Sequence, residues 1–154
     1  MKLAEALSVR ADLQKKVARL EERLQAVAKV QEGDEPEETP EDLFAELQQA
    51  IGELENLVFK INLTNLHTVR DGESITRMIA RKDALTLNIN TLRNVLKTAA
   101  GRETRYSHNE IKYVKVIDTA RLRKKIDTLS AELRKVELRI QEINWTVELE
   151  ETGD

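Results

Sequence analysis

The 154-residue sequence predicts an all-α protein, a long antiparallel coiled-coil-like bundle of four helices with a short β-hairpin between helices three and four. Three observations predict this fold class. Apolar residues recur at alternating spacings of three and four over long stretches, as in packed helices. Charged residues make up 34% of the chain and aromatic residues only 3%, which indicates narrow seams of Leu, Ile and Val. Capping and turn residues separate four such stretches.

The heptad pattern is most regular between Asp118 and Val147, the fourth expected helix. Asp118 is its expected N-cap. Charged residues lie between the apolar positions, so one stripe is apolar and the other faces suit water. Such a helix needs a partner helix for stability. The apolar seam consists of Leu122, Ile126, Leu129, Leu133, Val136, Ile140, Ile143 and Val147.

The first helix is expected from about Lys2 to Gln31. Arg10 breaks its apolar stripe, and Gly33 is expected to close the helix in the left-handed conformation. Residues 32–39 are too acidic to pack and predict a linker. The stripe consists of Leu13, Val17, Leu20, Leu24 and Val27.

The second helix is expected to start at Thr39-Pro40, a capping residue followed by the residue best suited to the first helical position. Leu43, Ala50 and Leu57 broaden its apolar face, so it is expected to contact more than one neighbour. Its predicted seam consists of Phe44, Leu47, Ile51, Leu54, Val58 and Ile61.

A chain reversal is expected over Leu66–Glu73, which contains Asp71-Gly72, and a third helix is expected from Ser74 to Gly101. Polar residues interrupt the apolar faces of helices two and three, at the same level if these helices are antiparallel. One interpretation is a ligand pocket in which an arginine holds an anion. The favoured interpretation is a buried network that sets helix register. The residues of this polar layer are Asn62, Asn65, Arg81 and Asp83.

The helical period stops between residues 102 and 117. Tyr106, Ile111, Tyr113 and Val114 belong to a β-prone run with a plausible turn at His108-Asn109, which predicts a short β-hairpin. After the fourth helix, the acidic tail from residue 148 to 154 is expected to be frayed. The length and patterning predict one helical-bundle domain over residues 1–154.

Composition argues against several classes of function. The absence of cysteine removes thiolate catalysis and disulfides, and suits a reducing cytoplasm. No signal-peptide core or transmembrane segment is evident in the sequence. The two histidines, His67 and His108, lack metal-ligand spacing, and no phosphate-binding loop or nucleophile motif occurs among five glycines. We therefore expect no catalytic residues, metal or cofactor, and no enzyme activity.

Charge distribution supplies the best candidate for a partner. Residues 97–125 contain nine basic and three acidic residues, whereas residues 32–55 contain ten acidic residues and no Lys or Arg. Association of these segments, within or between subunits, is favoured, and nucleic-acid binding by the basic segment is the alternative. The candidate interaction surface consists of Arg102, Arg105, Tyr106, Lys112, Tyr113 and Lys115.

Four short motifs together resemble the septicolysin-like family of small bacterial proteins. The motifs are Ile61-Asn62-Leu63-Thr64-Asn65, Arg81-Lys82-Asp83-Ala84-Leu85, Tyr106-Ser107-His108-Asn109-Glu110-Ile111-Lys112 and Ile140-Gln141-Glu142-Ile143-Asn144-Trp145. The resemblance covers about Leu3 to Leu149. It implies an all-helical fold with a small β element, and the family name implies a cytolysin.

The sequence thus predicts a non-enzymatic cytoplasmic structural or interaction protein of bacterial type that forms a homo-oligomeric helical assembly. The alternatives are a nucleic-acid-binding accessory protein acting through residues 97–125 and the cytolysin that the resemblance implies.

Overall fold

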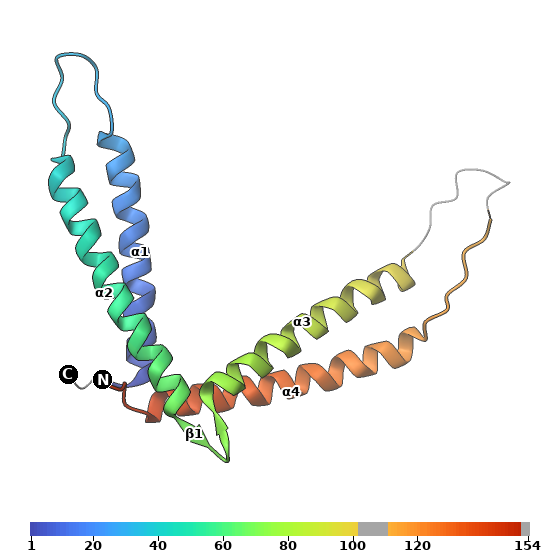
Figure 1. Ribbon diagram of the computed structural model, residues 1–154. Coiled ribbons are helices and arrows are strands. Elements are labelled where there is room, and N and C mark those ends of the chain that lie inside the picture. The colour runs from blue at the N-terminus through green and yellow to red at the C-terminus, as the bar shows by residue number, and fades with distance from the viewer. Residues whose placement is uncertain (102–110, 152–154) are drawn as a thin grey trace. The chain divides into compact units, whose positions relative to one another are not determined.

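The computed structural model describes residues 1–101 and 111–151, and it confirms an all-α fold with four helices and a short β-hairpin (Figure 1). The expected helices all form, with ends that differ from the sequence expectation by a few residues. The elements are α1 (Leu3–Val27), α2 (Pro40–His67), β1 (Val69–Arg70), β2 (Glu73–Ser74), α3 (Ile75–Ala100) and α4 (Thr119–Thr146).

The chain divides into two compact units, and the expectation of one helical-bundle domain stays a prediction. Unit 1 comprises residues 1–75 and 141–154, and unit 2 comprises residues 76–140. Helix α4 contributes its last residues to unit 1 and the rest to unit 2. A sequence pattern does not reveal this division, because the heptads of α4 run through it without interruption.

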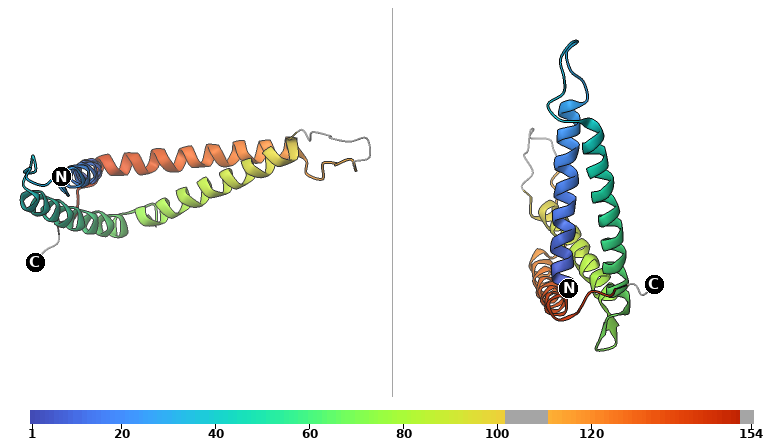
Figure 2. Two further views of the ribbon diagram at one scale, coloured as in Figure 1. Left: turned by 90° about the horizontal axis from the view of Figure 1, so that it is seen from above. Right: turned by 90° about the vertical axis from the view of Figure 1, so that its left-hand side faces the viewer.

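In unit 1, α1 and α2 lie side by side as an antiparallel pair, as Figure 1 and the right-hand view of Figure 2 show. The acidic linker of residues 32–39 belongs to the loop that connects α1 to α2 and is not helical, as predicted. Lys16 Nζ lies 3.3 Å from a Glu46 carboxylate oxygen, and Arg23 pairs with Glu38 of the linker. The core between the two helices consists of Leu20, Val27, Leu43 and Ala50, with Val17, Leu24 and Leu47 packed against it.

The predicted seam of α2 was wrong at every second position, where the observed inward residue is the one just before the predicted residue. Phe44 and Ile51 are exposed, while Leu43 and Ala50 are buried. Two heptads overlap in this helix and share every second member, so periodicity alone does not select between them. The small Ala50 side chain suits the close approach of α1. The inward positions are Leu43, Leu47, Ala50, Leu54, Leu57, Ile61 and Thr64.

Helix α1 ends at Val27, earlier than expected, and Gly33 does not close it. Gly33 does adopt the left-handed conformation, with φ of 89°, but in a turn of the acidic linker. Arg10 stands at an inward heptad position, half-buried, and its Nε has no hydrogen-bond partner among the residues that the structure describes.

The β-hairpin lies between α2 and α3, at the chain reversal around Asp71-Gly72. Val69 pairs with Ser74 and Arg70 with Glu73. Asp71 and Gly72 have φ values of 53° and 80°, and two successive positive φ values are what a tight type I′ turn requires.

The hairpin expected at residues 102–117 differs from what is observed. Residues 111–117 form no strand, and the remainder of that range, residues 102–110, lies outside the described residues. A β-prone composition does not by itself create a strand, because strand preference depends on context.

Residues 147–151 after α4 are held against both helices of unit 1, which corrects the expectation of a frayed tail for this part. Residues 152–154 lie outside the described residues. The N–H of Leu3 donates to the carbonyl of Val147 at 2.9 Å, and the N–H of Leu149 donates to the carbonyl of Met1 at 2.8 Å. Leu149 is buried. The N–H of Glu150 donates to Thr64 Oγ1 of α2 at 2.8 Å. We call residues 147–151 with these contacts the terminal clasp.

Each acidic side chain of the terminal clasp meets a basic group. Glu148 lies 2.7 Å from Lys2 Nζ and 3.0 Å from the terminal amino group, and these hydrogen bonds hold the pKa of Glu148 below its ordinary value. The Lys60 ammonium likewise lowers the pKa of Glu151. Glu150 lies 2.9 Å from His67 Nδ1. Glu148 and Glu151 are therefore matched by cations from other parts of unit 1, and Glu150 has a polar partner in His67.

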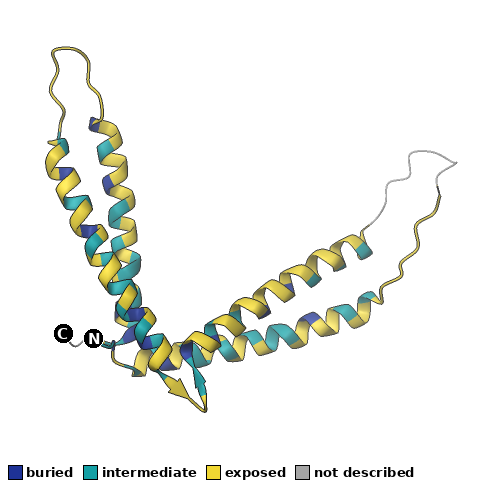
Figure 3. Ribbon diagram, viewed as in Figure 1, coloured by how far each residue is buried: buried dark blue, intermediate teal, exposed yellow. Residues whose placement is uncertain are grey.

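In unit 2, α3 and α4 form a second pair of helices, and the chain runs in opposite directions through them (Figure 1). Asp118 caps α4 as predicted, because its Oδ1 accepts from the N–H of Arg121 at 3.1 Å. The predicted seam of α4 lies on its inward face, because Ile126 is buried and the neighbouring seam positions are half-buried. Figure 3 shows how buried and exposed positions alternate along the helices. The buried positions of α3 within this unit are Met78, Leu85 and Ile89.

Candidate interaction surface

The segment of residues 111–117, between α3 and α4, exposes an apolar run. Ile111 is 90% exposed and Val116 is 96% exposed, and Tyr113, Val114 and Ile117 are exposed as well. Contiguous exposed apolar residues are uncommon on monomeric proteins and usually mark interaction sites. The sequence predicted a β-prone run here, and its exposure makes this segment a candidate contact surface.

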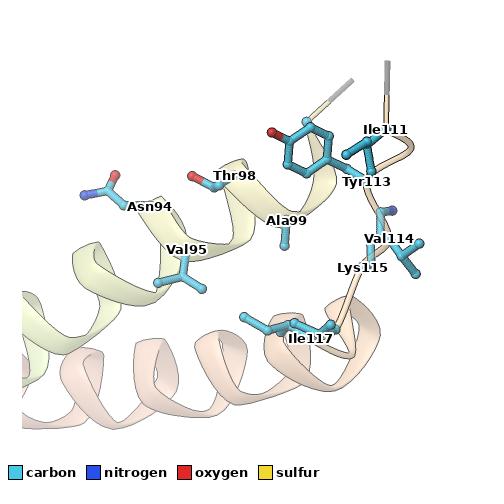
Figure 4. A pocket seen from close by; sticks show the side chains of 11 residues that line it. Asn94, Val95, Thr98, Ala99, Ile111, Tyr113, Val114, Lys115 and Ile117 are labelled. Carbon is cyan, nitrogen blue, oxygen red and sulfur yellow. The ribbon is translucent and has the colours of Figure 1, made fainter. Parts of the chain in front are cut away.

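This segment and the C-terminal end of α3 together line a groove of about 780 Å³, shown in Figure 4. Val95 and Ala99 of α3 and Ile117 supply apolar walls, and the ring of Tyr113 lies beside the last turn of α3 (Figure 4). We call this the apolar groove. Its complete lining is Asn94, Val95, Thr98, Ala99, Gly101, Ile111, Tyr113, Val114, Lys115, Val116 and Ile117.

The surroundings of the apolar groove are basic. Lys112 and Lys115 lie within the segment, and Arg121 and Lys124 follow in the first turns of α4, all exposed. Among the residues that the structure describes, these four form no ion pair. An exposed apolar surface flanked by unneutralised cations suits an acidic partner with apolar side chains.

The candidate interaction surface from the sequence is described only in part. Lys112, Tyr113 and Lys115 are exposed, and the last two line the apolar groove. Arg102, Arg105 and Tyr106 lie outside the described residues.

The predicted polar layer is not a set of buried side chains. Asn62, Arg81 and Asp83 are exposed, and Asn65 is half-buried. Asn62 and Asn65 belong to unit 1, whereas Arg81 and Asp83 belong to unit 2, so their pairing stays a prediction. The half-buried polar residue of that stretch of α3 is Lys82, which occupies an inward heptad position.

Sequence reasoning missed the exposure of Phe44, which it placed in the seam of the second helix, and made no prediction of exposure for Phe59 and Trp145. Phe44, Phe59, Tyr113 and Trp145 are the aromatic residues in the described ranges, and each is more than half exposed. Aromatic side chains are large apolar groups that proteins usually cover, and they are enriched at protein–protein interfaces. The overlap of two heptads in α2 hid the signal at Phe44, because the pattern assigned that residue to the core.

The described side chains do not assemble a metal site: no group of three or more His, Asp or Glu in residues 1–101 and 111–151 is placed to hold an ion. In the same part of the chain, none of the helices combines the length and the apolar character needed to cross a membrane.

Comparison with known proteins identifies the family. A model of a family of unknown function, DUF6847, matches residues 10–149 of the chain. The chain belongs to this family. A crystal structure of a functionally unknown conserved protein from Corynebacterium diphtheriae resembles this DUF6847 protein with a TM-score of 0.91 and 37% sequence identity, over 97% of this chain and 99% of that one. A search among functionally curated proteins found no match.

The expected septicolysin-like family was wrong, because the matching family model is that of DUF6847 and the similar crystal structure carries no lytic description. Three of the four motifs quoted for that resemblance lie in α2, α3 and α4, where heptad proteins share short runs without sharing a family. Most of the third motif, residues 106–112, lies outside the described residues. The lytic activity that the name implied has no support in this DUF6847 protein.

Proposed function

We propose that this DUF6847 protein is a non-enzymatic cytoplasmic interaction protein that forms homo-oligomers through residues 111–117 and the apolar groove. The observation that supports the proposal is the exposure of the apolar run in this segment. Covering such side chains removes apolar surface from water, at roughly 25 cal/mol for each Å².

Charge supports a second copy as the partner. The basic residues around the apolar groove have a counterpart in residues 32–55 of the same sequence, which contain ten acids and no Lys or Arg. Glu38 and Glu46 of that segment pair with α1, and the other acids are exposed. Two copies therefore carry complementary surfaces, which favours association and makes it sensitive to salt.

The chemistry on the surface favours binding over catalysis. Lys115 is the one ionisable side chain besides Tyr113 in the lining of the apolar groove, and it has no acid or base partner there. General acid–base catalysis needs a second positioned group with a matched pKa. A groove with apolar walls and one cation suits a docked side chain.

Light scattering after size-exclusion chromatography tests this function over a range of protein concentrations. We expect the wild-type chain to form oligomers that dissociate in high salt, and a variant with Ile111→Gln and Val116→Gln to be monomeric. Leu87→Gln is the matched control, because Leu87 is an exposed apolar residue of α3 outside the groove lining.

A wild-type protein that stays monomeric at every concentration would refute the assembly role. Electrophoretic shift assays with nucleic acid at low and high salt would then test the alternative use of the same basic residues. Salt-sensitive binding lost with Lys112→Gln and Lys115→Gln would establish that alternative.

A further inference from the structure

Helix α2 carries a second apolar stripe on the side that α1 does not cover. Phe44, Ile51, Phe59 and Leu66 follow one another at intervals of seven, eight and seven residues, so they share one face of the helix. All four are exposed, in contrast to the inward heptad that contacts α1. We call these four residues the α2 outer stripe.

The α2 outer stripe has acidic neighbours. Glu41 precedes Phe44 by three residues, and Glu55 stands four residues before Phe59, so both carboxylates share its face. Both are exposed, and neither forms an ion pair within the described residues. No Lys or Arg lies between residues 32 and 55. The α2 outer stripe is therefore an aromatic and acidic surface that α1 does not cover.

The apolar groove has the opposite character. It has apolar walls and room for large side chains, and Lys115 lies in its lining with Lys112 beside it. Aromatic anchors that enter apolar pockets carry much of the binding energy in protein interfaces. The molecule thus exposes phenylalanine side chains on one surface and an apolar groove with basic neighbours on another.

We infer that the α2 outer stripe of one molecule docks in the apolar groove and on residues 111–117 of a second copy. Phe44 and Phe59 are the anchors, and Glu55 faces the cations around Lys115. This inference rests on the proposed self-association and names its second surface. The lengths agree: Phe44 to Phe59 spans ~22 Å of helix at about 1.5 Å per residue, and seven extended residues reach at most ~25 Å.

An interface made from two different surfaces is heterologous. Each molecule offers one α2 outer stripe and one apolar groove, so a bound pair still carries one free copy of each surface. Association therefore continues into rings or chains, and the mass rises with protein concentration. A symmetric pairing of two α2 outer stripes would instead stop at a dimer.

Complementation between two variants tests the inference. The stripe variant carries Phe44→Gln and Phe59→Gln, and the groove variant carries Val114→Gln and Val116→Gln. These positions are exposed, so both variants should fold, which circular dichroism checks. Each variant alone should be monomeric, with self-association at least ~30-fold weaker than in the wild type. Mixed together, they should form a one-to-one dimer, because one intact stripe meets one intact groove.

The outcomes separate this inference from the proposed function. If the stripe variant keeps the wild-type mass while the groove variant is monomeric, self-association stands and the stripe is not its partner surface. If the stripe variant is monomeric and the groove variant still dimerises, two stripes pair with each other and the inference fails. A mixture that stays monomeric also overturns it. A monomeric wild type refutes the proposed function itself, and the inference falls with it.

Discussion

Thr64 links α2 to the terminal clasp through one hydroxyl group. Its Oγ1 donates to the carbonyl of Lys60 at 2.8 Å and accepts from the N–H of Glu150 at 2.8 Å. Thr64 is the buried polar residue of the described core and stands at an inward heptad position of α2. A polar residue is tolerated there because both of its hydrogen-bonding roles are filled.

Replacing Thr64 by Val should lower the free energy of unfolding by about 1 to 2 kcal/mol, because the shape is kept while the N–H of Glu150 loses its acceptor. Denaturant unfolding followed by circular dichroism measures the change. Thr64→Ser is the control, since it retains the hydroxyl. Equal stability of the Val variant and the wild type would mean that water replaces the hydroxyl at no cost.

At the scale of the helix, α2 uses its two overlapping heptads differently. The inward heptad packs on α1 around Leu20 and Ala50, while the α2 outer stripe is exposed. Apolar side chains are therefore buried on one side of α2 and exposed on the other. Burial, and not residue type, decides the contribution of each position to stability.

Truncating Leu20 and Leu66 to Ala compares a buried leucine with an exposed one in the same unit. Leu20 is 1% exposed and Leu66 is 56% exposed. We expect Leu20→Ala to destabilise by roughly 2 to 5 kcal/mol through lost burial and a residual cavity, and Leu66→Ala to change stability by about 0.5 kcal/mol or less. Thermal melts at low protein concentration check both values without a contribution from association. Similar losses in the two variants would contradict the assignment of the inward heptad.

At the scale of the whole molecule, the terminal clasp brings residues from the first and last described parts of the chain together. Backbone pairing of Lys2 with Glu148 is accompanied by the burial of Leu149 and by ion pairs of the clasp acids. These contacts join segments that are separated by most of the sequence.

Stability should fall in acid, because the pKa values of Glu148 and Glu151 are lower in the folded chain than the ordinary value of 4.5. A depressed carboxyl pKa stabilises the folded state above the unfolded pKa, and this contribution is lost as the pH falls below 4.5 through the folded value. Melting temperatures measured between neutral and acidic pH, for wild type and Glu148→Gln, check this. The variant should be less stable at neutral pH and show a weaker acid dependence.

Glu22→Gln is the control for the acid dependence, since Glu22 is an exposed residue of α1 away from the terminal clasp. An identical pH profile for Glu148→Gln and the wild type would show that the ion pairs of Glu148 do not contribute to stability.

The sequence by itself determined the four helices, their approximate ends and the inward face of α4. Heptad spacing, the Asp118 cap and the Thr39-Pro40 start are local signals, and local backbone and side-chain preferences act without knowledge of the fold. The chain reversal at Asp71-Gly72 was predicted for the same reason. Composition also singled out residues 111–117 as an unusual run, although it assigned them a strand.

Only the tertiary structure decided which of two overlapping heptads in α2 faces α1, because both have the same period and differ by one position. It also decided that residues 147–151 are held in place, since the partners of Glu148, Glu150 and Glu151 come from residues far away in sequence. The α2 outer stripe and the apolar groove became visible for the same reason: whether an apolar residue is covered depends on its neighbours in space.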